Sequence, residues 1–251
     1  MRKSLSESSF GSLIGNANQI YVHILSFTDY KPPFAEQTAA DFATFLDSLT
    51  KQNSQAAANA QAYSLAVENR QNAFFKGDNS LIKVASTVNG MVRARFGKGS
   101  KQLADIKRLT TRIKGNKSQK AAVVPPVAAT TSTGTEPAPP PTSTRTISLS
   151  ERSFGSLTKT FGDIISTLEG FGDAYKPINT MTVAEMKKLL DNLTAANTNA
   201  TAAYGVLQLS RSERVAMYDK LKHRVRSIKD SVKAQYGVTS SEYRLIKGIK
   251  I

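Results

Sequence analysis

The chain has 251 residues and a formal net charge of +15, and it contains no cysteine and no tryptophan. This length suits one large domain or two domains of about 100 residues each. The absence of cysteine excludes disulfides, thiol chemistry and cysteine-based zinc sites. No stretch approaches the roughly 18 apolar residues that a spanning helix needs, so we expect no integral membrane insertion.

The first residues carry a basic pair, Arg2 and Lys3, with no apolar run behind it. A secretory signal is therefore not expected, and we predict a cytoplasmic location. The lack of cysteine does not help with this assignment, because such a chain suits the cytosol and the outside of a cell equally.

A ten-residue segment near the start of the chain returns in its second half. Residues 4–13 read SLSESSFGSL and residues 148–157 read SLSERSFGSL, which differ at a single position. Further matches follow in the same order, among them Tyr30 with Tyr175, Asn53 with Asn197, Arg70 with Arg214 and Val92 with Val232. The sequence therefore predicts a tandem duplication of a unit of about 105 residues.

Each copy is predicted to be all-α, a small antiparallel bundle of three to four helices. We expect residues 1–116 to form the first repeat, with a basic C-terminal segment, and residues 146–251 to form the second. The segment 117–145 between them is rich in proline, threonine and alanine. Such a composition cannot bury a core, so it predicts a flexible linker.

The repeated ten-residue segment opens the first helix of each copy. Apolar residues recur at spacings of three and four from Phe10 to Phe27 and from Phe154 to Phe171, which predicts one buried face on each helix. The favoured interpretation of the segment is helix initiation by a hydroxyl cap. The alternative is a contact surface, copy to copy or chain to chain, made by Phe10, Gly11, Phe154 and Gly155.

Capping signals predict where the later helices begin. The second and third helices of the second copy are expected to start at capping boxes, Thr182 with Glu185 and Ser210 with Glu213. In the first copy, the break at residues 77–79 separates the second helix from the third. The third helices are predicted to end at Gly97 and Gly237, and short fourth helices to begin at Ser100 and at Ser240 or Ser241.

The positive charge is confined to the end of each copy. Residues 70–120 hold thirteen basic and two acidic side chains, and residues 211–251 hold eleven basic and four acidic ones. Residues 1–69 and 146–210 are each slightly acidic. Two cationic faces are therefore predicted, and cationic faces attract polyanions by counterion release. A solvated basic surface that only keeps the protein soluble is the alternative.

The candidate polyanion-binding residues lie on these two segments. In the second copy, four cations recur at steps of four, three and four beside the apolar stripe. The complete candidate set is Arg93, Arg95, Lys101, Lys107, Arg108, Arg112, Lys222, Arg226, Lys229 and Lys233. Such residues would hold the phosphate backbone without base specificity, so nucleic acid or a ribonucleoprotein is the expected partner.

The sequence contains none of the usual catalytic arrangements. Its two histidines, His23 and His223, lie at non-equivalent positions, and no metal-binding or phosphate-loop motif is present. We therefore expect no enzyme, no metal and no cofactor. Two other functions remain open: a structural protein that assembles through helix contacts with itself or a scaffold, and a peripheral binder of anionic membranes through amphipathic helices.

Overall fold

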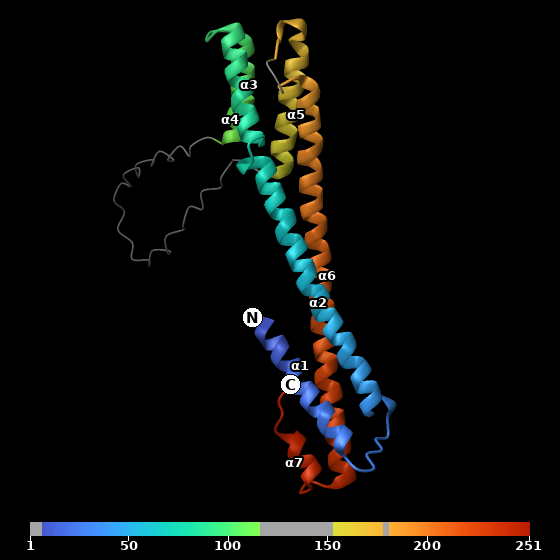
Figure 1. Cartoon of the computed structure of the whole chain (residues 1–251). Helices are drawn as coiled ribbons and strands as arrows, with labels where there is room; N and C mark the ends of the chain where they lie inside the picture. Colours follow the sequence, from blue (N-terminus) through green and yellow to red (C-terminus); the bar gives the residue numbers. More distant parts are fainter. Residues whose placement is uncertain (1–6, 116–152, 178–180) are drawn as a thin grey trace, which may run out of the picture. The chain divides into compact units, whose positions relative to one another are not determined.

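The computed structural model describes residues 7–115, 153–177 and 181–251 (Figure 1). Every regular element in these ranges is helical, which confirms the predicted all-α class. The predicted linker, 117–145, lies outside the described residues. The elements are α1 (Glu7–Ser26), η1 (Ala35–Gln37), α2 (Ala39–Gln71), η2 (Asn72–Lys76), α3 (Leu81–Phe96), α4 (Lys101–Lys114), α5 (Phe154–Gly170), η3 (Gly172–Ala174), α6 (Val183–Tyr236) and α7 (Ser241–Lys247).

Most of the predicted helix ends are confirmed by their hydrogen bonds. The hydroxyl oxygens of Thr182, Ser100 and Ser240 each accept a backbone N–H from the residue three positions further on, and Thr38 caps α2 in the same way. Gly97 and Gly237 follow α3 and α6 with φ of 86° and 95°. This left-handed backbone favours glycine, so the two residues stop their helices as expected. No described helix carries an apolar stretch long enough to cross a bilayer.

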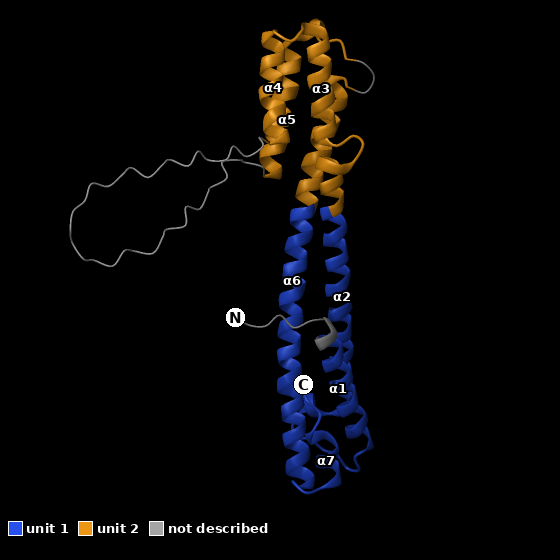
Figure 2. Ribbon diagram, turned by 90° about the vertical axis from the view of Figure 1, so that its left-hand side faces the viewer, with its two compact units in different colours: residues 1–67, 200–251 blue, residues 68–199 orange. Residues whose placement is uncertain are grey.

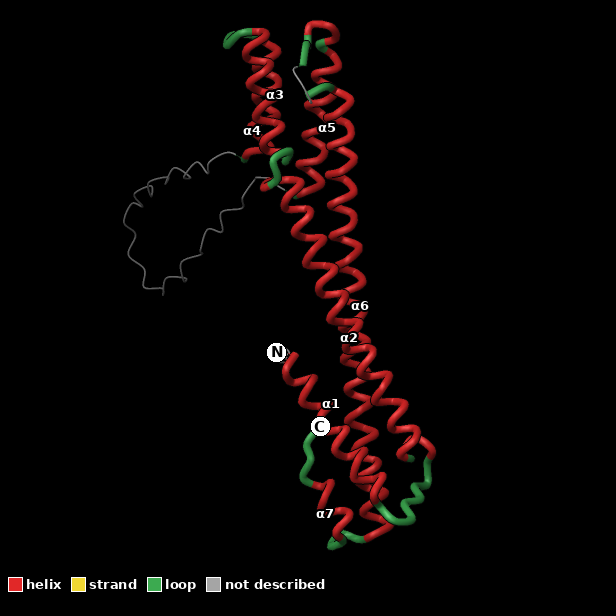
Figure 3. The backbone as a smooth tube through the Cα atoms, viewed as in Figure 1, coloured by secondary structure: helices red, strands yellow, loops and turns green. Residues whose placement is uncertain are grey.

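The predicted start of a third helix at Ser210 is wrong. Residues 183–236 form a single helix of 54 residues, which Figure 3 draws without interruption. The Ser210 hydroxyl is buried and donates back to the Leu207 carbonyl at 3.0 Å, so it caps nothing. The helix continues because its buried positions keep a seven-residue spacing through this region. These positions are Met186, Leu193, Ala200, Leu207, Arg214, Leu221 and Ile228.

The predicted break in the first copy is confirmed, and a length difference explains it. Arg70 and Val92 are 22 positions apart, whereas the matching Arg214 and Val232 are 18 apart. Four additional residues turn a helix by about 40° more than one full turn, so they shift the buried stripe around the helix. They are accommodated by the wide turn η2, where the Gly77 N–H donates to the Asn72 carbonyl at 2.8 Å, and by the loop before α3 (Figure 3).

The described residues divide into two compact units (Figure 2). Of the described residues, unit 1 contains 7–67 and 200–251, and unit 2 contains 68–115, 153–177 and 181–199. Among the described residues, each unit combines a part of residues 7–115 with a part of residues 153–251. Helical periodicity identifies the apolar face of a helix but not the helix that covers it.

The core of unit 1 lies between α1, the first part of α2, the last part of α6 and α7. Its members from the first half of the chain include Phe10, Ile20, Phe42 and Leu49, which are almost completely buried. Its members from the second half are Tyr218, Leu221, Val225, Ile228, Val232 and Ile246. Val215, on the same part of α6, is 46% exposed and does not belong to this core.

The core of unit 2 is built from the segments of the two halves of the chain that unit 1 does not contain. Residues 68–115 supply Phe74 from η2 and the buried faces of α3 and α4. Residues 153–199 supply α5 and the beginning of α6. The buried residues of these two segments include Leu157, Phe161, Ile164, Leu168, Met186 and Leu193. Helix α4 packs against both α3 and α5.

Candidate anion-binding faces

Helix α4 in unit 2 presents the strongest concentration of exposed positive charge. The helix starts at the Ser100 cap and ends at Gly115, which has a φ of 78°. One side of it is buried by Leu103, Ile106, Leu109, Thr110 and Ile113. The opposite side exposes Lys101, Lys107, Arg108, Arg112 and Lys114, and Asp105 is its only acidic residue.

The cations of α4 form two rows along the exposed side. At roughly 100° per residue, Lys101, Arg108 and Arg112 share one row, whereas Lys107 and Lys114 share another about 120° away. The rows extend over about 20 Å of helix at 1.5 Å per residue. None of the five side chains forms an ion pair with a described carboxylate. All five are therefore available to an external anion.

Two further candidates of unit 2 lie in the last turn of α3. Arg93 and Arg95 are both exposed there, where the carboxyl end of the helix dipole favours cations. The Arg95 Nε donates to the backbone carbonyl of Ala174 at 3.2 Å, which ties its guanidinium to the η3 turn. Arg93 makes no such contact within the described residues and remains a surface charge.

The predicted stripe on α6 in unit 1 is partly occupied by internal contacts. Lys222 forms an ion pair with Asp219 at 3.3 Å. Lys229 is half-buried and donates to the backbone carbonyls of Ile249 at 2.5 Å and Lys247 at 3.3 Å. Burial lowers the pKa of the Lys229 ammonium. Lys229 therefore anchors the C-terminal segment and is not the free surface cation that the sequence predicted.

The other two cations of that stripe, Arg226 and Lys233, are exposed and form no ion pair within the described part of the chain. The stripe of four thus contains two freely available charges. The two predicted faces are unequal, and the face on α4 is the larger.

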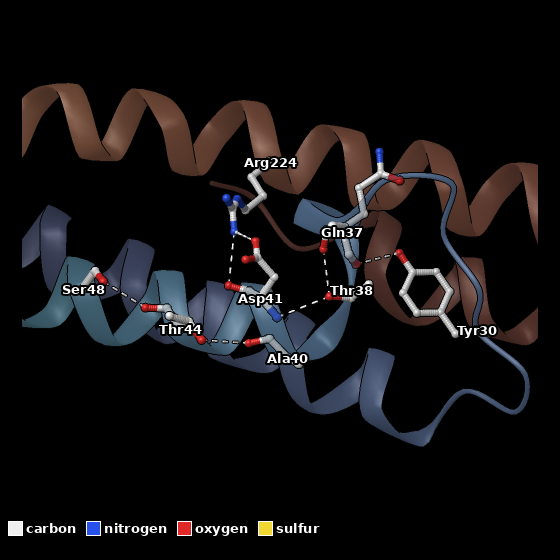
Figure 4. Close-up of polar contacts among 9 residues, drawn as sticks. Tyr30, Gln37, Thr38, Ala40, Asp41, Thr44, Ser48 and Arg224 are labelled. Carbon is white, nitrogen blue, oxygen red and sulfur yellow. Dashed lines mark hydrogen bonds and ion pairs between the residues drawn. The ribbon is translucent and has the colours of Figure 1, made fainter.

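Arg224 lies in the basic stretch of α6, between the candidate residues Lys222 and Arg226, but is not one of the candidates. Its Nη1 donates to the Asp41 carboxylate at 2.6 Å and to the Asp41 backbone carbonyl at 3.2 Å (Figure 4). Its guanidinium carbon lies 4.5 Å from the centre of the Phe45 ring. Asp41 sits in the first turn of α2, held by the Thr38 cap. Arg224 therefore joins α6 to α2, and no periodicity in the sequence indicates that role.

The aromatic residues of the predicted contact segment face the cores. Phe10 is 3% exposed, and its ring centre lies 4.5 Å from that of Tyr218. Phe154 is half-buried, and its ring centre lies 5.0 Å from that of Phe74. Gly11 and Gly155 are both exposed. Phe10 thus packs in unit 1 and Phe154 packs in unit 2, and each contacts an aromatic residue from the other half of the chain.

No group of three or more His, Asp or Glu side chains that could hold a metal ion occurs among the described residues. In comparisons with known proteins, no family model, curated protein or solved structure matches the chain. Any functional assignment must therefore come from the surfaces themselves.

Proposed function

We propose that this chain is a non-enzymatic cytoplasmic binding protein that holds an anionic polymer, nucleic acid or a ribonucleoprotein, through basic faces without base specificity. In this proposal the chain is a tandem duplication of a small helical bundle, joined by a proline-, threonine- and alanine-rich linker at 117–145. The duplication carries one basic face in each copy.

A single observation carries the proposal: α4 exposes five cations that form no ion pair with a described carboxylate, and the helix contains only one acidic residue. Such a density of like charge destabilises a surface unless counterions or a polyanion compensate it. A flexible polyanion can follow two rows of cations over about 20 Å and release several condensed counterions at once.

The exposed side of α4 favours recognition of the phosphate backbone. The helix contains no aromatic residue, so it offers no surface on which bases could stack. Ala104 and Thr111 are the small side chains between the two rows of cations. With few groups able to reach base edges, we expect affinity that depends on charge and varies little with base sequence.

Fluorescence anisotropy with a labelled short DNA duplex tests the proposal. We expect binding at about 50 mM salt that weakens steeply as salt is raised, by about 0.9 log units of affinity per log unit of salt for each phosphate contact. The slope of log affinity against log salt concentration is negative. The variant Lys107→Gln/Arg108→Gln/Arg112→Gln/Lys114→Gln should reduce its magnitude by between about 3 and 4.

A control with the same change in charge separates a specific face from overall charge. Lys76, Lys98, Lys159 and Lys176 lie outside α4 in unit 2, and all four are exposed and form no ion pair with a described carboxylate. Their combined replacement by glutamine should change the salt slope much less than the α4 variant does. Affinity that stays in the millimolar range at about 50 mM salt, or that does not respond to salt, contradicts the proposal.

A second candidate function is favoured by a different observation. The two predicted repeats contribute complementary halves to each core. A structural protein could assemble through the same packing, if a repeat of one chain packed against a repeat of the same kind from another chain.

A further inference from the structure

Each unit of this protein has a core that neither predicted repeat can complete alone. In unit 1, α1 and the first part of α2 cover the apolar face of α6 and α7. In unit 2, α5 and the first part of α6 cover the apolar faces of α3 and α4. Separation of the two repeats would expose to water those parts of the buried faces that pack across the repeats, such as the contact of α4 with α5, which is strongly unfavourable.

The contacts between the repeats correspond residue by residue in the two units. Arg214 lies over the Phe10 ring at 4.3 Å in unit 1, and its match Arg70 lies over the Phe154 ring at 4.0 Å in unit 2. At the other end of the first helices, the ring centres of Phe27 and Tyr236 are 5.9 Å apart, and those of Phe171 and Phe96 are 5.4 Å apart. Equivalent contacts of this kind are a property of twofold, self-complementary interfaces.

The polar contacts in unit 1 also join one repeat to the other. Tyr218 donates its hydroxyl to the Phe10 carbonyl at 3.1 Å, and Tyr236 donates to the Thr28 carbonyl at 2.7 Å. Ser231 donates to the Gln37 side-chain oxygen at 2.6 Å. Because these bonds are buried or lie at the edge of the core, they fix how the second half of one repeat docks onto the first half of the other.

We propose that the two repeats are binding partners, so that the chain is in effect a two-subunit assembly joined by a peptide segment. The interaction surface of each repeat is the apolar side of its first two helices, and the partner that fits it is the last part of another repeat of the same kind. The cores, not the covalent connection, hold the two repeats together. The association of the two repeats does not depend on anion binding, and the two proposals are tested by separate experiments.

Cleavage of the intact protein tests the proposal. A protease recognition sequence is inserted after Gly134, within the predicted linker, and the purified full chain is then cut. We expect the two fragments to coelute with the mass of the uncut chain in size-exclusion chromatography with light scattering. Separation of the fragments, folded or unfolded, overturns the proposal.

Concentration dependence provides a second readout. If the cores hold the two fragments together, unfolding of the cut protein dissociates them. Its melting temperature should then rise by about 2–4 °C for each tenfold increase in protein concentration. The uncut chain, tested in parallel, should show no such change. A melting temperature of the cut protein that is independent of concentration contradicts the proposal, because it would mean that each repeat folds by itself.

Discussion

The guanidinium carbon of Arg70 lies 4.0 Å from the centre of the Phe154 ring, although the two residues belong to different predicted repeats. The Arg70 Nη1 also donates to the Asn197 side-chain oxygen at 3.3 Å, and its Nε is buried without a hydrogen-bond partner. A guanidinium can stack on an aromatic face while its edges donate hydrogen bonds. Arg70 therefore contributes to the packing of unit 2 and is not part of a surface that could bind anions.

Replacement of Arg70 should destabilise the protein even though it removes a positive charge from a basic chain. We expect Arg70→Ala to lower the free energy of unfolding by about 1–3 kcal/mol, through loss of the stacking on Phe154 and of the bond to Asn197. Arg70→Lys should retain only part of this stability, because an ammonium cannot stack as a planar group. Urea unfolding of both variants provides the measurement.

The matched control for that measurement is Arg108→Ala on α4. Arg108 is exposed and unpaired among the described residues, so its removal should change the unfolding free energy by no more than about 0.5 kcal/mol. Equal effects of the Arg70 and Arg108 substitutions would contradict a packing role for Arg70.

The inequality of the two basic faces predicts unequal effects on polyanion binding. Lys107→Gln/Arg108→Gln/Arg112→Gln on α4 should lower the salt slope of duplex DNA binding by about 2.7. Lys222→Gln/Arg226→Gln/Lys233→Gln on α6 should lower it by no more than about 2, because Lys222 is already paired with Asp219. Salt titrations of DNA binding by both triple variants provide the measurement. A larger effect of the α6 variant would contradict the conclusion that the face on α4 is the larger one.

The sequence was sufficient to predict the helices whose ends are marked by glycine or by a hydroxyl cap. Ser100, Ser240 and Thr182 cap as expected, and Gly97 and Gly237 terminate their helices. These signals are local, because a cap involves only the residues of one helical turn. The apolar stripes of the first helices were predictable for the same reason.

Ser210 shows where a local signal fails. Ser210 and Glu213 match a capping box, yet both lie inside the continuous helix α6. Serine and glutamate also occur within helices, so the motif marks a helix start only where the chain cannot continue as a helix. No proline or loop interrupts residues 195–209, and the seven-residue spacing of buried positions continues through them. The tertiary packing, and not the motif, therefore determines that no helix begins at Ser210.

The roles of Lys229 and Arg224 could not be predicted for a different reason. Both lie in the basic stretch of α6, where the pattern of charge indicates a solvated or anion-binding surface. Their actual partners are the carbonyls of the C-terminal segment and the Asp41 carboxylate. These partners come from other elements of unit 1, so their positions depend on the tertiary fold and are invisible to periodicity.

The raised pKa of Tyr30 predicts a loss of stability at alkaline pH. Its hydroxyl donates to the Gln37 backbone carbonyl at 3.2 Å (Figure 4), and burial together with the nearby Tyr236 raises the pKa of Tyr30 to about 12 from its ordinary value of 10.0. The folded state therefore retains a proton that the unfolded chain releases above pH 10. The free energy of unfolding should be unaffected by this residue below pH 10 and should fall as pH rises from 10 to 12.

Tyr30→Phe provides the comparison for that pH dependence. The variant lacks the ionisable hydroxyl, so its unfolding free energy should fall less steeply between pH 10 and pH 12 than that of the wild type, as measured by urea unfolding at each pH. Burial also raises the pKa of Tyr236, so part of the alkaline loss should remain in the variant. Identical pH profiles for the two proteins would contradict the contribution assigned to Tyr30.

Two glycines at α3 should respond to alanine in opposite directions. Gly90 lies inside the helix, and a Cβ added there would meet nothing within 4 Å. Gly90→Ala should therefore raise the free energy of unfolding by about 0.5–1 kcal/mol, because alanine restricts the unfolded chain and favours the helix. Gly97 follows the same helix with a φ of 86°, which an L side chain rarely adopts. Gly97→Ala should lower the free energy of unfolding by about 1–2 kcal/mol.

Thermal unfolding of the two glycine variants beside the wild type provides the measurement, with Gly237→Ala as a further comparison. Gly237 has a φ of 95° at the end of α6 and should behave like Gly97, because the same backbone conformation terminates both helices. A stabilising effect of alanine at Gly97 or Gly237 would mean that these helices do not end in a left-handed residue. A destabilising effect at Gly90 would mean that its surroundings in unit 2 have no room for a methyl group.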